Sequence, residues 1–216
     1  SPDFLELDPL MAIATLVEPE YQKKMNKRIQ SRLRSAHLRG CPQELTNCVD
    51  SAEREYLPRG ITETLSTLDF IDSGLNVCIL GPSDSGKSYL AKALGIVACN
   101  NYKVEYHHCE TLLETLVALK AQDYSKYQKR LKKICGAALL ILDDFLLHTI
   151  TDEREVKVLF EILEKRCEIN LSTIICSQRE PASWSSMILN DEVSANAILK
   201  RATKHYTVVI KPNITD

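Results

Sequence analysis

The segment that constrains this chain most is Gly81-Pro82-Ser83-Asp84-Ser85-Gly86-Lys87-Ser88. Its two glycines let the backbone wrap closely around phosphate oxygens, because glycine accepts conformations that other residues rarely adopt. Lys87 brings a full positive charge to the β- and γ-phosphates, and the hydroxyl of Ser88 is a ligand for Mg²⁺. An apolar run precedes the segment and an amphipathic one follows, so the context is strand, loop and helix. We therefore expect ATP and Mg²⁺ to be bound by Gly81, Pro82, Ser83, Asp84, Ser85, Gly86, Lys87, Ser88 and Tyr89.

The pattern of the residues after position 76 predicts an α/β fold of the P-loop NTPase type. Short apolar runs alternate with amphipathic segments, as in a parallel sheet that is covered by helices on both faces. We expect five parallel strands at 76–80, 103–107, 138–143, 172–177 and 206–211. The helices expected between them lie at 87–99, 109–121, 124–134, 152–167 and 191–205.

A basic amphipathic helix is expected before this domain. Apolar side chains recur there at every fourth residue, which is helical spacing, in Tyr21, Met25, Ile29 and Leu33. The segments 40–42 and 57–60 contain Gly and Pro and interrupt the helical pattern. We therefore expect a small helical region at 1–58, with its main helix at about 18–39, and the nucleotide-binding domain at 59–216.

Two aspartates follow the most apolar of the predicted strands, in Ala137-Ala138-Leu139-Leu140-Ile141-Leu142-Asp143-Asp144. Ligands of open α/β sheets lie at the carboxyl ends of the strands. We expect Asp143 to hold Mg²⁺ and Asp144 to orient the attacking water, since phosphoryl transfer depends on positioning and charge compensation. Polar residues end the strand at 172–177, so Ser177 and Gln178 are expected near the γ-phosphate. Arg201, on the last predicted helix, is a candidate for inserting charge into the nucleotide site of a neighbouring subunit.

Positive charge is concentrated in two blocks, although 27 basic and 29 acidic side chains leave a net charge of only -2. The first block lies at 21–40, contains no acid and includes Lys24, Arg28 and Arg32. The second block, at 120–133, carries Lys120, Lys126, Lys129, Arg130, Lys132 and Lys133. For one block alone, a solvated helix face is as good an explanation as a binding surface. If the chain binds DNA, clustered cations of this kind would neutralise phosphates without reading sequence, and the scarcity of interleaved aromatic residues would favour duplex over single-stranded DNA.

Composition excludes several classes of protein. With 44% hydrophobic and 26% charged residues, the sequence is neither disordered nor fibrous. Eight scattered cysteines without a Cys-x-x-Cys pair, the lack of signal-peptide features and the lack of a membrane-length apolar run favour a cytoplasmic protein with reduced thiols. His107 and His108 have no partners at metal-ligand spacing, so a zinc site is not expected.

Taken together, these motifs resemble the IstB family of ATPases that help insertion-sequence transposition. The resemblance runs from about residue 18 to 210, and more distantly it extends to the helicase loaders DnaC and DnaI. It rests on Leu57-Pro58-Arg59-Gly60, Gly74-Leu75-Asn76-Val77, Gly81-Pro82, Gly86-Lys87-Ser88-Tyr89-Leu90-Ala91, Leu139-Leu140-Ile141-Leu142-Asp143-Asp144, Ser172-Thr173, Ser177-Gln178 and Trp184.

The resemblance implies an AAA+ ATPase that assembles with ATP on duplex DNA as a homo-oligomer and recruits and stimulates a transposase. By matching position it implies nucleotide and Mg²⁺ roles for Lys87, Ser88, Asp143 and Asp144, a γ-phosphate sensor at Ser177 and Gln178, and an arginine finger at Arg201. The block at 120–133 falls where related proteins insert a helix that lines the DNA path. Asp144 is one methylene shorter than the glutamate usual in AAA+ enzymes, which implies slow turnover. Related proteins also continue past the last strand into a segment that often supplies another arginine, whereas this sequence ends at Asp216.

Two other functions share the same phosphate loop. A replicative helicase loader would use its N-terminal segment to recognise a helicase, and the basic helix expected at 18–39 suits DNA or self-assembly better. A small-molecule kinase would need a substrate pocket and an arginine-bearing lid, and no segment supplies both.

Overall fold

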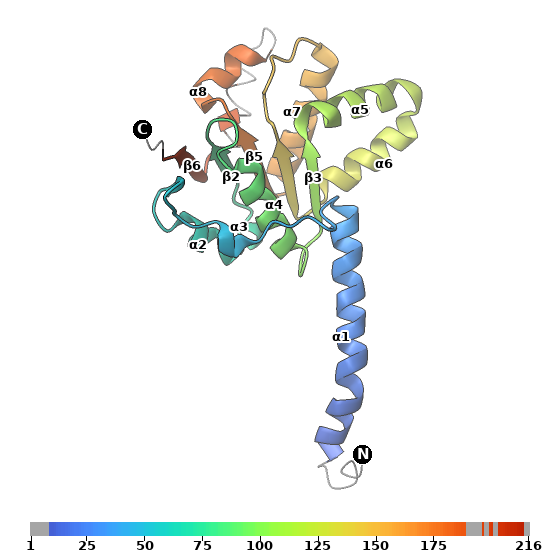
Figure 1. The fold of residues 1–216 in the computed structure, drawn as a ribbon. Coiled ribbons are helices and arrows are strands. Elements are labelled where there is room, and N and C mark those ends of the chain that lie inside the picture. Colours follow the sequence, from blue (N-terminus) through green and yellow to red (C-terminus); the bar gives the residue numbers. More distant parts are fainter. Residues whose placement is uncertain (1–8, 189–195, 197–198, 201–202, 214–216) are drawn as a thin grey trace.

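A mixed sheet lies at the centre of the fold, with strand order β1-β6-β2-β5-β4-β3 among the residues described. The computed structural model describes residues 9–188, 196, 199–200 and 203–213 (Figure 1). The strands are β1 (Arg54–Leu57), β2 (Val77–Leu80), β3 (Val104–His108), β4 (Leu139–Asp143), β5 (Ser172–Ser177) and β6 (Tyr206–Pro212). Strands β2 to β6 correspond to the five predicted strands and are all parallel to one another.

The prediction of five strands was wrong in one respect, because β1 adds a sixth. It pairs antiparallel with β6, in a register that runs from Arg54 opposite Pro212 to Leu57 opposite Val209. Only Tyr56 of its four residues is buried. An edge strand that buries one side chain gives no apolar run, so the sequence pattern did not reveal it. β1 lies before residue 58, so the predicted N-terminal region supplies one strand of the sheet; the division at that residue stays a prediction.

Alternate residues of the strands face two separate hydrophobic cores, as period-two side-chain geometry requires. Ile79, Ile141 and Ile174 lie in the core beneath α4, whereas Leu140 and Ile175 lie in the core beneath α5, α6 and α7. The expectation of helices on both faces is therefore confirmed (Figure 1). The helices are α1 (Pro9–Ser35), α2 (Ile61–Ser66), α3 (Asp69–Asp72), α4 (Lys87–Ala98), α5 (Cys109–Gln122), α6 (Tyr124–Cys135), α7 (Glu153–Glu168) and α8 (Pro181–Trp184), with short 3-10 turns at Leu45–Asn47 and Ser185–Met187.

Helix α1 extends away from the rest of the molecule and contacts it only through its carboxyl-terminal end (Figure 1). Its 27 residues span about 40 Å at the usual rise of an α-helix. The helix begins at Pro9, well before the predicted start at about 18. It ends at Ser35, earlier than the predicted position 39, because His37 adopts a left-handed conformation (φ 59°) and the Leu38 N–H bonds back to the Leu33 carbonyl. The helix predicted at 191–205 falls largely outside the described residues. None of the helices that the structure describes has the length and apolar character that a membrane crossing requires.

Arg166 fastens helix α7 to the second core. The side chain is only 1% exposed, and burial lowers its pKa to about 10, so it remains protonated at neutral pH. No carboxylate balances its charge in the part of the chain described, and five oxygen atoms accept its hydrogen bonds instead. These are the carbonyls of Ile134, Cys135, Ala137 and Ser172 and the hydroxyl of Thr173.

We predict that Arg166→Met destabilises the protein by about 3 kcal/mol or more, because several buried carbonyls lose a charged donor. Equilibrium denaturation in urea measures this loss. The matched control is Lys165→Met, which removes a partly exposed partner of Glu161 on the same helix and should have a far smaller effect. Equal losses in the two variants would contradict the prediction.

Candidate functional site

The phosphate loop at residues 81–88 connects β2 to α4, as the sequence predicts. Gly86 precedes α4 with φ 101°, which suits glycine. Gly81 has no room for a side chain, since a Cβ there would lie 2.6 Å from Ser85 Oγ and 2.7 Å from the Ile210 carbonyl oxygen. The loop is therefore closely packed and aims the amino-terminal end of α4 at the space where phosphate is expected.

Lys87 is held inside this loop. Its Nζ donates a hydrogen bond to the Pro82 carbonyl at 2.5 Å, and the residue is 6% exposed. Burial lowers the pKa of Lys87, while the carboxylates of Asp143, Asp144 and Asp84 oppose that shift. The structure thus brings the predicted lysine and both predicted aspartates into one electrostatic environment.

Asp143 is fully buried and joins three elements of the site. Ser88 Oγ donates to Asp143 Oδ1 at 3.0 Å, and Tyr106 Oη on β3 donates to Oδ2 at 2.5 Å. The backbone N–H of Asp144 also donates to Asp143 Oδ1, at 3.0 Å. Ser88 and Asp143 offer the hard oxygen ligands that Mg²⁺ prefers, so these residues fit the ion. Their role as its ligands stays a prediction.

Asp144 faces away from this buried network and contacts a histidine. The residue has a left-handed backbone (φ 53°), and its Oδ2 lies 2.9 Å from His108 Nδ1 at the end of β3. The side chain is 37% exposed, so it is accessible to water, as a group that orients the attacking water must be. His108 is therefore a candidate for directing this carboxylate.

Ser177 and Gln178 have different surroundings. The Ser177 hydroxyl is buried, donates to the Phe145 carbonyl at 2.8 Å and accepts from the Arg179 N–H at 3.1 Å. Its bonding capacity is therefore used within the protein. Gln178 instead lines a cavity of about 350 Å³ with Gly81 and Pro82, which favours Gln178 as the residue closer to the nucleotide. Arg201, the predicted arginine finger, lies outside the described residues.

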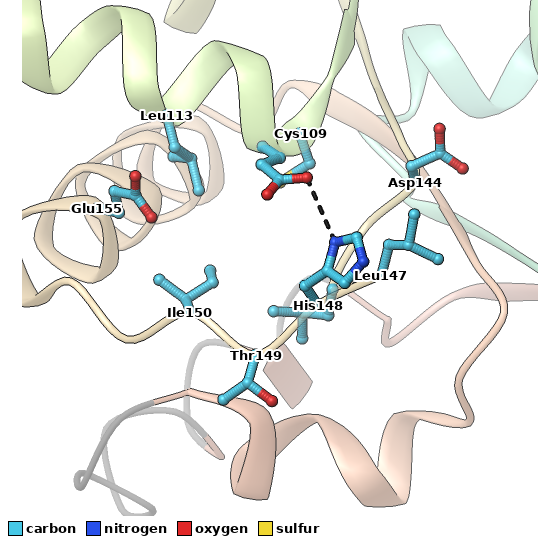
Figure 2. Close-up of a pocket in the computed structure, with 10 residues that line it drawn as sticks. Cys109, Leu113, Asp144, Leu147, His148, Thr149, Ile150 and Glu155 are labelled. Atoms are coloured by element: carbon cyan, nitrogen blue, oxygen red, sulfur yellow. Dashed lines mark ion pairs between the residues drawn. The ribbon is translucent and has the colours of Figure 1, made fainter.

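A small cavity of about 40 Å³ lies on the other side of Asp144, between the loop after β4 and helices α5 and α7 (Figure 2). His148 Nδ1 and Glu110 Oε2 form an ion pair at 3.4 Å at its rim. Cys109 and Leu113 line it, and burial raises the pKa of the Cys109 thiol to about 12, so that the thiol is unreactive. A space of this size holds water rather than a substrate, and it gives no support to a small-molecule kinase.

The predicted DNA-binding residues fall into two groups, and in the first group each side chain has a partner within the protein. Arg32 donates to the carbonyls of Cys99 and Asn100 at the carboxyl-terminal end of α4. Lys120 pairs with Glu161, and Lys126 with Asp123. Arg130 and Lys133 pair with the buried Glu105, at 3.6 and 2.7 Å.

Glu105 depends on these partners. Burial alone would raise its pKa, but hydrogen bonds from His107 and Lys133 and the charges of Lys133 and Arg130 hold the pKa below its usual value. The carboxylate is therefore charged at neutral pH and anchors α6 to the edge of the sheet. The second group, Lys24, Arg28, Lys129 and Lys132, is exposed and forms no ion pair with another described residue.

Two cavities follow strand β3, the free edge of the sheet, and bring the two basic blocks together. The first, of about 480 Å³, lies between the carboxyl-terminal ends of α1 and α6, and its lining includes Arg32, Lys103, Lys132 and Lys133. The second, of about 430 Å³, has a lining that includes Lys92, His107, His108 and Arg130. We call the pair the β3 cavities. The first of them shows that the end of α1, with Arg32, and the end of α6, with Lys132 and Lys133, line one basic cavity although the two basic blocks are distant in sequence.

The whole chain was compared with known proteins. It matches the family model described as IstB-like ATP binding protein over residues 6–213. The chain belongs to this family. The insertion sequence ATP-binding protein y4uH of Sinorhizobium fredii is 38% identical over 190 residues, which cover 88% of this chain and 74% of the relative. The IS21 ATP-binding protein of Pseudomonas aeruginosa is 29% identical over 206 residues, covering 94% and 75%. The sequence comparison thus identifies this chain as an IstB-like ATPase.

Solved structures confirm the AAA+ fold of this IstB-like chain. The DnaC helicase loader is 20% identical with a TM-score of 0.60, covering 79% of this chain and 98% of the loader. DnaA bound to AMPPCP and single-stranded DNA is 20% identical with a TM-score of 0.63, covering 80% of this chain and 50% of DnaA. At these identities the likeness shows the fold alone.

Sequence reasoning missed Tyr106 and His108, the two β3 residues that contact the aspartates. The strand was predicted at 103–107, and its carboxyl end lies beside that of β4, with His108 opposite Asp143. Polar residues at the carboxyl end of a strand next to the aspartates were the available signal. In the sequence, His107 and His108 were considered only as metal ligands. The described residues contain no group of histidine, cysteine and acidic side chains that could hold a metal ion.

We predict that Asp144→Asn lowers kcat for ATP hydrolysis by about 100-fold or more, because a neutral amide polarises water poorly. ATP affinity should be retained, since the phosphate loop is untouched. Steady-state phosphate release and nucleotide titration separate the two effects. Glu110→Gln, an acid at the opposite rim of the small cavity, is the control and should keep near-normal turnover. Full turnover in Asp144→Asn would exclude the water-orienting role of Asp144.

We predict that His108→Ala lowers kcat by about tenfold with little change in KM, since Asp144 loses the contact that directs it. His108→Asn, which keeps a donor near Asp144, should recover part of the rate. His148→Ala removes an exposed histidine that pairs with Glu110, so its kcat should stay close to that of the unmodified protein. The histidine contact has no positioning role if His108→Ala and His148→Ala behave alike.

Proposed function

We propose that this protein is an ATP-dependent DNA-binding ATPase that helps insertion-sequence transposition by assembling on duplex target DNA and recruiting a transposase. Its curated relatives are named insertion sequence ATP-binding proteins, which supports a role in a mobile element. ATP and Mg²⁺ would be held by the phosphate loop with Ser88 and Asp143. Arg201 would complete the site of a neighbouring subunit in a homo-oligomer that works in the cytoplasm.

The observation that carries the DNA-binding part is the basic surface around the β3 cavities. The ends of α1 and α6 line the first cavity with Arg32, Lys132 and Lys133, and Lys92 and Arg130 line the second. A phosphate backbone that follows β3 would therefore meet cations at both cavities. The surface contains more lysine and arginine than aromatic residues, which favours phosphate contacts over base stacking. Binding by such a surface is independent of sequence and weakens steeply as salt rises.

The ion pairs assign different roles to the basic residues. Lys129 and Lys132 lie on the exposed side of α6 and are available to phosphates. Arg130 and Lys133 hold Glu105, and Arg32 caps α4, so these residues build the surface as well as charge it. Among the nine residues predicted to bind DNA, we therefore propose Lys24, Arg28, Lys129 and Lys132 as the main phosphate contacts.

We predict that Lys129→Ala with Lys132→Ala weakens duplex binding and lowers the slope of log affinity against log salt by about 2, one for each lost phosphate contact. The free energy of unfolding should not change, because neither lysine has a partner in the described structure. Fluorescence anisotropy with ATP, across a salt series, measures the slope. Lys157→Ala with Lys204→Ala removes the same charge from exposed positions elsewhere and should keep the original slope.

The same salt series tests the residues that hold Glu105. Arg130→Ala with Lys133→Ala should lose stability as well as affinity, since it leaves Glu105 buried without its cations.

The binding measurement also addresses the helicase-loader alternative. Failure of the protein to bind duplex DNA, with and without ATP, would contradict the transposition role. A stable complex with a replicative helicase would then favour the loader, whereas a complex with the transposase supports our proposal.

A further inference from the structure

Strand β1 delivers two polar side chains to the phosphate loop. Both β1 and β2 neighbour β6, where Val209 pairs with Leu57 on one side and with Leu80 on the other. Because β1 is antiparallel, its first residues lie at the carboxyl edge of the sheet, where the loop begins. Arg54 and Tyr56 therefore reach the same edge as Gly81, although more than twenty residues separate them in the sequence.

Arg54 lies directly against the loop. A Cβ on Gly86 would be 2.5 Å from Arg54 Nη1 and 4.0 Å from Tyr56 Oη. Gly86 therefore leaves space for a guanidinium in addition to providing a left-handed backbone. Burial raises the pKa of Tyr56, and the neighbouring Arg54 charge opposes that rise, so the two side chains form one electrostatic pair beside the loop.

Two buried hydroxyls lie in this corner. Three buried side-chain polar atoms in the described structure have no partner in full hydrogen-bond geometry, and two of them are the hydroxyls of Tyr56 and Ser85. Both residues are nearly fully buried, at 2% and 4% exposure. The neighbours of the Tyr56 hydroxyl are the Arg54 guanidinium and the Cys48 thiol. A buried hydroxyl without a well-placed partner is costly, so the Ser85 hydroxyl in the loop and the Tyr56 hydroxyl beside it leave hydrogen-bonding capacity for a ligand.

Arg54 has only a weak anionic partner in the described structure. Its one ion pair in the described structure is with Glu53 Oε2 at 3.8 Å, and the Glu53 side chain is 83% exposed. Such a pair is weak and easily exchanged. A guanidinium recognises phosphate through two parallel donors, and phosphate is the anion that this loop is built to hold.

We propose that Arg54 is a nucleotide-binding residue that pairs with the phosphate chain of ATP at Gly86, with the Tyr56 hydroxyl as a second contact. The proposal rests on ATP binding by the phosphate loop and is independent of DNA binding. It makes the strand before residue 58 part of the ATP site. It also gives the loop a second cation that comes from outside the phosphate-loop motif.

The test is nucleotide affinity, measured by titration with mant-ATP and by its displacement with ATP or inorganic tripolyphosphate. Arg54→Ala should weaken ATP and tripolyphosphate by the same factor, about 10- to 100-fold, the size expected for a charge-assisted contact. Arg54→Lys should recover part of the affinity, and Tyr56→Phe should lose less. Arg59→Ala is the matched control, since that arginine is 86% exposed and pairs with Glu55; its affinity should not change.

Thermal unfolding without nucleotide shows whether each variant is folded, and Lys87→Ala shows whether the measured binding uses the phosphate loop. Unchanged ATP affinity in Arg54→Ala, with or without lower stability, would overturn the proposal and leave Arg54 a structural link between β1 and the loop. Loss of ATP affinity with normal tripolyphosphate affinity would also overturn it, because Arg54 would then contact the base or ribose. Failure of the unmodified protein to bind mant-ATP would instead refute ATP binding itself.

Discussion

The site depends on the hydrogen bonds that the buried carboxylate of Asp143 accepts. The carboxylate accepts hydrogen bonds from the helix after the phosphate loop, from strand β3 and from the backbone of its own turn. A buried charge is tolerated only with such partners, so the relative positions of α4, β3 and β4 are fixed by the need to satisfy it. The oxygens predicted to hold Mg²⁺ are therefore arranged by the same contacts that assemble the fold.

Much of the fold could be predicted because buried parallel strands are apolar along their whole length. Strands β2 to β6 and the strand-end position of the two aspartates were predicted for this reason, whereas the phosphate loop was predicted from its two glycines, Lys87 and Ser88. β1 was not, since an edge strand with one buried residue resembles a loop. The end of α1 depends on the left-handed backbone of His37, a conformation that local sequence did not reveal.

The candidate site was less predictable, because charge alone does not show where a side chain is engaged. The basic block at 120–133 looked uniform in sequence, yet Glu105 on β3 engages Arg130 and Lys133 while Lys129 stays exposed. His108 and Arg54 become relevant only through neighbours that are distant in sequence, Asp144 and Gly86. Such roles are set by sheet register, and register is a tertiary property.

The position of β1 also determines how the sheet meets solvent. It covers the outer edge of β6, whose residues Tyr206–Pro212 would otherwise present a row of unpaired N–H and C=O groups. A fragment that starts after Pro58 would expose this edge and would tend to pair with another chain by strand addition. In two fragments of this kind, Arg54 would be absent from the phosphate loop. In two chains that exchange β1, the arginine next to each phosphate loop would come from the other molecule. The affinity of the site for ATP would then depend on whether β1 covers the outer edge of β6.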